Sequence, residues 1–271
     1  MTQRPKAGPR RPPAPPERPA PRERPAPRER PGPRDRAAHP SRANLSELAY
    51  ERLEEMIVAC TLRPGCFLSI QELQDLTGLG RTPIHQAVSR LSADTLFVIR
   101  PRHGLQVAPI DLARERTLLR LRRDMERFVV RLATERSDAS HRNQFLHIAG
   151  ALRDRADRMT IDEFNRLDRR IDRQLIAASG EPFLEQTLRP LHTMFRRIGY
   201  VFHTWVAPRE GLVRTLECHL AILDAVAAGR VADAVAASDR LIAFSDSMFD
   251  LLGRGVDPAL FDCNQELPIA S

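Results

Sequence analysis

The stretch Gly78–Leu91, GLGRTPIHQAVSRL, has the pattern of a short helix that buries one face and presents a polar one. Thr82 suits the N-cap position, and Pro83 suits the first helical position, where no amide hydrogen is missed. Apolar residues recur at helical spacing at Ile84, Ala87, Val88 and Leu91. We therefore expect this stripe to pack on neighbouring helices.

The residues left off the apolar stripe are polar or basic: Arg81, Thr82, His85, Gln86, Ser89 and Arg90. A helix that enters the major groove of DNA reads bases with its N-terminal half, and its N-terminus favours phosphate. Arg81 can pair with two acceptors of guanine, and Gln86 can reach adenine. A polar helix face alone is more often plain solvated surface. The flanking sequence is therefore needed to distinguish a DNA-reading face from such a surface.

The flanking sequence completes a recognisable order of elements. Apolar spacing from Asn44 predicts a first helix of about 15 residues, capped by Asn44 or Ser46. Ser69 caps a short second helix that ends at Gly78 and Gly80. After the third helix, two β-prone runs at 96–100 and 105–108 predict a hairpin. Three helices followed by a hairpin predict a winged helix-turn-helix over residues 44–110.

Charge is distributed unevenly in this predicted DNA-binding domain, although it holds only six arginines against seven acidic residues. The acids Glu47, Glu51, Glu54 and Glu55 lie on the first helix. The basic residues gather on the third helix and the hairpin: Arg81, Arg90, Arg100, Arg102 and His103. A basic end on the reading helix and wing favours DNA binding.

The net charge of +7 comes from residues 1–43, which hold 12 basic and 4 acidic residues and 13 of the 22 prolines. A six-residue repeat, Glu17–Arg22, recurs twice there with one Gly-for-Ala change. Such a segment buries nothing, so we expect a disordered arm with polyproline II character. It is either a solvated extension or a basic arm that adds phosphate affinity to the DNA-binding domain.

The cysteines Cys60, Cys66, Cys218 and Cys263 show neither metal-ligand spacing nor a secreted disulfide framework. No run of about 18 apolar residues suggests a membrane span, and the N-terminal charges precede no apolar segment. We therefore expect a cytoplasmic protein without a membrane partner.

Residues 111–252 are helical in pattern throughout, with breaks that predict about six helices. The fold class is mostly α: a winged helix-turn-helix followed by an all-α bundle that supplies its own core. Residues 253–271 show no periodicity and are expected to form a loose tail.

The segment Leu68–Ile110 resembles the DNA-binding domain of GntR-family transcription regulators, whose hallmark is Ser-Arg-Thr-Pro-Val-Arg-Glu-Ala-Leu and a wing ending in a basic-Gly step. Matching residues fall in register without a gap: Arg81, Thr82, Pro83, Ala87, Arg90, Leu91 and Gly104. The sequence departs from the hallmark at Gly80, His85, Gln86 and Gln71. Because His85 stands where the family has a second arginine, the operator sequence of relatives does not carry over.

Three later segments resemble the FCD domain, the all-helical effector module of the FadR-like branch of this family. They are LRLRRDMERFVVRLATER from Leu119, DEFNRLDRRIDRQLIAASGEPFL from Asp162 and ECHLAILDAVAAGRVADAVAA from Glu217. Together with the DNA-binding domain, the resemblance covers residues 44–250. It implies an effector-binding and dimerisation domain over residues 111–252.

Many FCD domains hold a divalent metal with one Asp and three His. Transferred to this sequence, these positions are Asp168, Asp172 in place of a His, His219, and Leu241. Asp168, Asp172 and His219 could form a facial triad for Zn²⁺, Ni²⁺ or Mn²⁺. Alternatively, Asp172 pairs with an arginine and His219 is an ordinary core histidine, and no cofactor is needed.

Other candidates for an effector pocket are Arg122 and the helical pair His192 and Arg196, spaced i,i+4. Arg122 could pair with a carboxylate effector, while a solvated basic ridge is the alternative for the helical pair.

The resemblance implies a homodimeric, ligand-responsive regulator that binds double-stranded DNA at a palindromic operator, more often a repressor, and senses a small acidic metabolite. It is not expected to be an enzyme. The alternatives are a metal-dependent enzyme built on the bundle and a regulator whose effector site has decayed.

Overall fold

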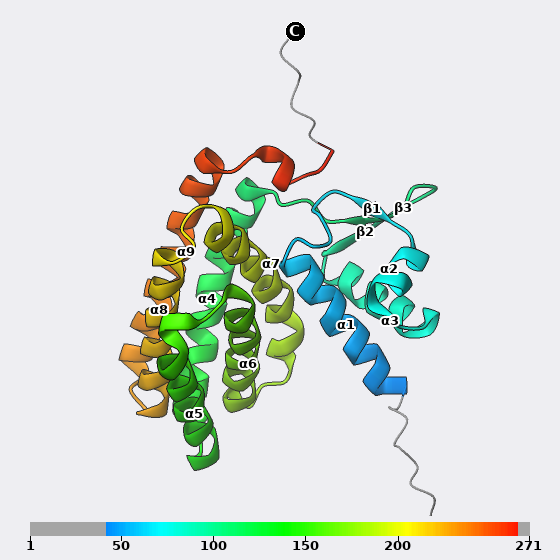
Figure 1. Cartoon of the computed structure of the whole chain (residues 1–271). Coiled ribbons are helices and arrows are strands. Elements are labelled where there is room, and N and C mark those ends of the chain that lie inside the picture. Colours follow the sequence, from blue (N-terminus) through cyan, green and yellow to red (C-terminus); the bar gives the residue numbers. More distant parts are fainter. Residues whose placement is uncertain (1–41, 265–271) are drawn as a thin grey trace, which may run out of the picture. The chain divides into compact units, whose positions relative to one another are not determined.

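The computed structural model describes residues 42–264, and the predicted basic arm lies outside the described residues up to position 41. A winged-helix region comes first in the chain (Figure 1). Its elements in chain order are α1 (Arg42–Val58), β1 (Phe67–Leu68), α2 (Ile70–Thr77), α3 (Arg81–Ala93), β2 (Phe97–Arg100) and β3 (Gly104–Val107). The predicted helices and hairpin are confirmed.

The three strands form an antiparallel sheet in the order β1-β3-β2. Phe67 pairs with Gln106, and Arg100 pairs with Gly104 at the tip of the wing. Arg102 and Gly104 have φ angles of 68° and 93° there, so the turn uses the left-handed region twice. β1 was not predicted, because two residues are too few to show an alternating pattern.

Helix ends follow the sequence signals in part. Ser69 and Glu72 form the reciprocal capping box of α2, and Gly78 ends that helix with φ 67°, as its position predicts. The cap predicted for α3 is wrong: the amide of Ile84 bonds to the carbonyl of Gly80 at 3.3 Å, so Gly80 is the N-cap and Thr82 lies inside the first turn. α1 likewise begins before the predicted caps Asn44 and Ser46.

Apolar residues of all three helices and the wing share one core, in which Tyr50, Ile84 and Leu91 are buried. The four stripe residues expected from the opening stretch, Ile84, Ala87, Val88 and Leu91, are all buried on α3. This packing leaves the opposite face of α3 to solvent.

The second part of the chain is a helical bundle with its own core, from Ile110 to Phe261. The six predicted helices are present: α4 (Leu112–Arg136), α5 (Ala139–Arg155), α6 (Ile161–Ser179), α7 (Phe183–Trp205), α8 (Glu210–Ala227) and α9 (Val231–Gly255). α4 contacts α6, α7, α8 and α9, so it lies at the centre of the bundle (Figure 1). Within residues 42–264, none of the helices has the length and apolar character needed to cross a membrane.

Two local signals position the helices around the later site. Thr160 and Glu163 form a capping box that starts α6. Gly211, at the start of α8, lies so close to α7 that a Cβ atom would meet Phe202 at 2.7 Å and His203 at 2.9 Å. A glycine is therefore required where these two helices approach each other.

The tail predicted from Gly253 differs in the structure. α9 continues to Gly255, Val256 and Phe261 are buried, and the amide of Ile110 bonds to the carbonyl of Phe261 at 2.8 Å. Burial of these two apolar side chains anchors the segment, although no periodicity marks it in sequence. Residues 265–271 of the predicted tail lie outside the described residues.

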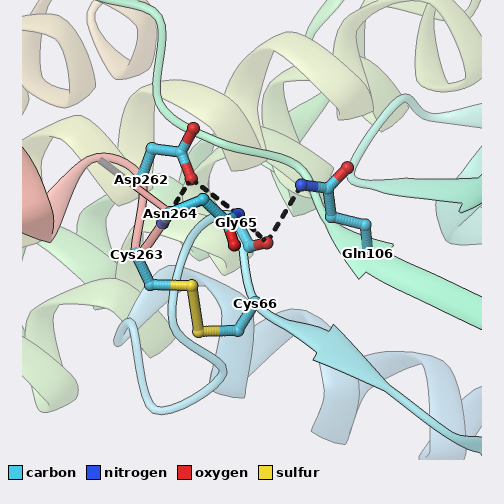
Figure 2. Close-up of a disulfide and its surroundings, with 6 residues drawn as sticks. All are labelled: Gly65, Cys66, Gln106, Asp262, Cys263 and Asn264. Atoms are coloured by element: carbon cyan, nitrogen blue, oxygen red, sulfur yellow. Dashed lines mark hydrogen bonds between the residues drawn. A yellow bond between two sulfur atoms is a disulfide. The ribbon is translucent and has the colours of Figure 1, made fainter. Parts of the chain in front are cut away.

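A disulfide joins Cys66 to Cys263, which lie 197 residues apart in sequence (Figure 2). The side-chain amides of Gln106 and Asn264 both donate to the backbone carbonyl of Gly65, at 3.0 and 2.7 Å. Gly65 has φ 82°, and a Cβ atom there would clash with Asp262. The disulfide was not predicted, because neither spacing nor periodicity marks a pair so distant. It ties the entrance of β1 to the C-terminal segment.

Replacing Cys263 with serine should lower the free energy of unfolding by up to about 5 kcal/mol, because the bond restrains a very long loop in the unfolded chain. Urea unfolding without reductant measures this. Cys218→Ser, at a half-buried free cysteine, serves as the control. Equal unfolding midpoints for the wild type and Cys263→Ser would argue against the bond in solution.

Candidate DNA-binding and effector-binding sites

The N-terminal half of α3 presents a continuous polar face to solvent. Its exposed residues are Arg81, Thr82, His85, Gln86 and Ser89. Arg81 Nε lies 3.4 Å from His85 Nε2, so the histidine nitrogen accepts there. The hydroxyl of Ser46 on α1 donates to Gln86 Oε1. The side chains expected to read bases therefore lie together, and their contact with DNA stays a prediction.

Arg90 lies on a different side of α3. It forms a 2.6 Å ion pair with Glu47 of α1, and its guanidinium stacks on Tyr50, 4.1 Å from the ring centre. Nine residues separate Arg90 from Arg81, which is two and a half helical turns, so the two side chains point in opposite directions. These contacts hold α3 on α1, and the contact of Arg90 with DNA stays a prediction.

The tip of the wing carries the other predicted DNA contacts. Arg102, His103 and Gly104 are all exposed there. Arg100 is also exposed, and its Nε donates to Gln106 Oε1 at 3.0 Å. Gln71 is exposed on α2, where its amide donates to Asp75 at 2.9 Å. The wing thus presents two arginines and a histidine to solvent.

The bundle holds a cavity of about 50 Å³ between α4, α6, α7, α8 and α9. This volume has room for about four water molecules. A ligand that enters without moving the surrounding side chains can therefore have only a few heavy atoms. The cavity lining includes four basic side chains, Arg122, His192, Arg196 and His219, against the acid Asp168, and His203 lines it as well. The apolar part of the wall includes Phe164, Phe195 and Met248. All three predicted effector-binding residues therefore lie at one cavity.

Arg196 occupies the place between the two predicted metal-ligating carboxylates. Its Nε donates to Asp168 and its Nη2 donates to Asp172, both at 3.0 Å. The two acids are spaced i,i+4 on α6, so they share a face that meets α7. Charge from His219 and Arg196 holds the pKa of Asp168 below its usual range, despite a burial penalty that acts in the opposite direction.

Both ring nitrogens of His219 face hydrogen-bond acceptors. Nδ1 lies 2.8 Å from the carbonyl of Thr215, and Nε2 lies 2.9 Å from Asp168 Oδ1. Burial lowers the pKa of His219, but the hydrogen bond and charge of Asp168 outweigh it, so the pKa is raised. With acceptors at both nitrogens, the imidazolium form fits this position, and it has no lone pair for a metal.

His192 joins Arg122 and Arg196 into one network through two acids. His192 Nε2 lies 2.8 Å from Glu126, which also accepts from Arg122 Nε at 3.1 Å. His192 Nδ1 lies 3.2 Å from Asp172. Burial lowers the pKa of His192, but the charges of Asp172 and Glu126 raise it further than burial lowers it. The three predicted effector-binding bases are therefore held rigidly by buried acids.

These contacts do not fit a bound metal ion. Within residues 42–264, no three His, Cys, Asp or Glu side chains are arranged to hold one. A guanidinium hydrogen-bonds both Asp168 and Asp172, so a dication between them would face a fixed positive charge. The fourth family position is Leu241, which supplies no ligand. The metal triad expected from the resemblance is therefore replaced by an arginine–carboxylate cluster.

Sequence reasoning missed Glu54, whose carboxylate bonds to Arg196 from α1. Its only sequence signal was membership of the acidic run on the first helix. Two other acids of that run also form ion pairs with the bundle. Glu51 pairs with Arg173 at 2.7 Å, and Glu55 pairs with Arg169 at 3.0 Å. Three acids of α1, Glu51, Glu54 and Glu55, are therefore the partners of bundle arginines.

Family models match two successive parts of the chain. Residues 45–107 match "Bacterial regulatory proteins, gntR family", and residues 117–244 match "FCD domain". The chain is similar to the HTH-type transcriptional repressor RspR of Escherichia coli K12, with 28% identity over 182 residues, 67% of this chain and 78% of the relative. An uncharacterized HTH-type transcriptional regulator of Streptomyces ambofaciens is 27% identical over 190 residues, 67% and 75% of the two chains.

Two solved structures have a similar fold. E. coli McbR/YncC superposes with a TM-score of 0.66 at 16% identity, covering 76% of this chain and 97% of the other. A putative GntR transcriptional regulator from Rhodococcus sp. RHA1 gives a TM-score of 0.56 at 22% identity, covering 77% and 98%. The winged helix and the helical bundle therefore occur together in known structures.

Because Arg196 fills the carboxylate pair, one equivalent of Zn²⁺, Ni²⁺ or Mn²⁺ should leave the melting temperature of the protein unchanged. Thermal unfolding combined with metal analysis of the purified chain checks this. His219→Gln is the matched variant, because it removes the imidazole of the family site. A metal-induced rise that His219→Gln abolishes would contradict the prediction.

His203 gives the bundle a pH dependence. Burial of its ring, with added repulsion from His219, lowers the pKa of His203 to about 4 from an ordinary value of 6.5. The ring stays neutral in the folded state while the unfolded chain takes up a proton, so stability is full above pH 6.5 and is lost as pH falls towards 4, by about 3 kcal/mol at most. Relative to His203→Gln, the free energy of unfolding of the wild type should fall across this range.

Urea unfolding at a series of pH values measures the difference. His147→Gln, at an exposed histidine of α5, is the control and should track the wild type. Parallel curves for the wild type and His203→Gln would exclude the proposed contribution of this ring.

Proposed function

The chain is a ligand-responsive, DNA-binding transcription regulator of the GntR family with an FCD domain, and from this premise we propose that it is a homodimeric repressor of a palindromic operator. The observation that carries the proposal is the exposed polar half of α3, together with the exposed basic residues at the tip of the wing. In this proposal, α3 enters the major groove and the wing contacts the neighbouring backbone.

Each exposed side chain has a role that its chemistry supports. Arg81 offers two parallel donors to the acceptors of guanine, and Gln86 offers a donor and an acceptor suited to adenine. His85 is shorter than the family arginine and reads a base through one nitrogen at a time. Arg102 and His103 add phosphate contacts that position the domain without selecting sequence.

Three further points support the remaining parts of the proposal. One such module reads only a few base pairs, so a two-fold dimer on a palindrome supplies the rest of the site. The similarity to a regulator named as a repressor favours repression. A regulator of this kind acts where its chromosomal DNA lies, in the bacterial cytoplasm.

We propose a small acidic metabolite as the ligand of the bundle cavity. The acids Glu126 and Asp172 stand behind the basic groups that they hold, while Arg122, His192, Arg196 and His219 line the wall. A carboxylate in the cavity would therefore meet several positive groups and the one lining acid, Asp168. The small cavity and its aromatic wall favour a short carbon chain.

Replacing Arg81 with alanine should weaken binding to the preferred duplex by about 5- to 150-fold, corresponding to the loss of about 1–3 kcal/mol, and should relax the preference at one base per half-site. The duplex is obtained by selecting random DNA with the full-length protein, and affinity is measured by fluorescence anisotropy. Arg254→Ala, at an exposed arginine of the bundle, is the control. Selected sequences without a palindrome, or equal losses in both variants, would overturn this assignment.

A further inference from the structure

Arg196 binds carboxylates from both parts of the chain at once. Its Nε and Nη2 contact Asp168 and Asp172 of α6, and its Nη1 donates to Glu54 Oε1 of α1 at 3.2 Å. Arg196 is 7% exposed and Glu54 is 2% exposed, so this contact between the bundle and the winged-helix region is shielded from water. A charge-assisted bond in such a place is much stronger than one at the surface.

Glu54 has other partners that could keep it satisfied if Arg196 withdrew. Its Oε2 lies 3.2 Å from Arg169 Nη2, and the hydroxyl of Thr193 donates to its Oε1. By contrast, Asp168 and Asp172 each hold a histidine as well as Arg196 and lie on one rigid helix. Glu54 is therefore the carboxylate that Arg196 can exchange with the least rearrangement.

Arg196 lines both the basic cavity and the groove between α1 and α6. We propose that Arg196 is the fixed cation that binds the carboxylate of a small ligand, in place of a metal ion, and that it does so by releasing Glu54. Arg196 then determines the ligand class and transmits its binding to the winged-helix region. This inference rests on the proposed function, because it requires an acidic ligand in the cavity.

The release would reach the DNA-binding face through α1. α1 packs against α7 on one side and α3 on the other. Two contacts bind α3 to α1. Arg90 of α3 pairs with Glu47 of α1, and the hydroxyl of Tyr50 on α1 donates to Asp94 at the end of α3 at 3.0 Å. A shift of α1 would therefore carry the recognition helix with it and change the spacing of the two helices in a dimer.

The first experiment needs no ligand. Glu54→Gln keeps a side chain of the same shape but removes the charge that binds Arg196, so it should mimic the released state and change operator affinity by about 5- to 150-fold. Hydrogen exchange should rise in both α1 and residues 164–175 of α6. The matched control is Arg173→Gln, which removes an arginine–glutamate bridge from α1 without touching the cavity. It should leave the affinity within about twofold, because many exposed bridges contribute little or nothing measurable.

Glu54→Asp provides a second variant if the glutamine fails to fold, because it keeps the charge but shortens its reach towards Arg196. A change in affinity of either sign that Arg173→Gln does not share supports the relay. An increase in affinity would count against release of DNA by the ligand while supporting the relay. Unchanged affinity in a folded Glu54 variant, or an equal change in Arg173→Gln, would overturn it.

The second experiment uses propionate and succinate as probes, with propionamide and succinamide as neutral counterparts. The acids should raise the melting temperature of both the wild type and Glu54→Gln, but they should release DNA only from the wild type. If neither acid binds either protein, the acidic ligand of the proposed function fails, while the first experiment still decides the relay. Equal release of DNA from both proteins would contradict the relay alone.

Discussion

The burial of one guanidinium organises this protein. Arg196 lies out of water, and a buried cation is tolerated only where carboxylates surround it. Its three partners come from two helices that lie more than one hundred residues apart in sequence, Glu54 on α1 and the pair Asp168 and Asp172 on α6. Loss of one partner would leave the buried guanidinium with two carboxylates in place of three to offset the cost of taking its charge out of water. The cluster therefore fixes where the first helix can lie on the bundle.

This constraint explains the charge pattern of the winged-helix region. The acids Glu51, Glu54 and Glu55 of α1 oppose arginines of α6 and α7. Arg189 of α7 adds a 3.2 Å ion pair with Asp94 at the end of α3. The basic residues at the wing tip, by contrast, are exposed. Acidic residues on α1 and basic residues on α3 and the wing favour DNA binding. The acidic side of this distribution also serves to attach the DNA-binding domain to an arginine-rich bundle.

The sequence was sufficient for features that depend on local patterns. The apolar stripe of α3, the capping box at Ser69 and the six bundle helices all follow from spacing within a few residues. Features that depend on partners far along the chain could not be predicted. The bond between Cys66 and Cys263 and the filling of the metal position by Arg196 both require knowing which helices become neighbours. The i,i+4 pair of His192 and Arg196 was visible, but its acidic partners were not.

Arg197, the residue after Arg196, also connects the bundle to the winged-helix region. Both contacts therefore start from α7. Arg197 is 1% exposed, and it donates to the carbonyl of Ala108 at 2.7 Å and to Glu115 at 3.2 Å. It therefore holds the segment that leads from the wing into α4, while Arg196 holds α1. Successive residues of a helix point about 100° apart, so one turn of α7 reaches both places. Any movement of that turn caused by a ligand would act on the winged-helix region at two points, which favours a rotation of the region as a whole over local loosening.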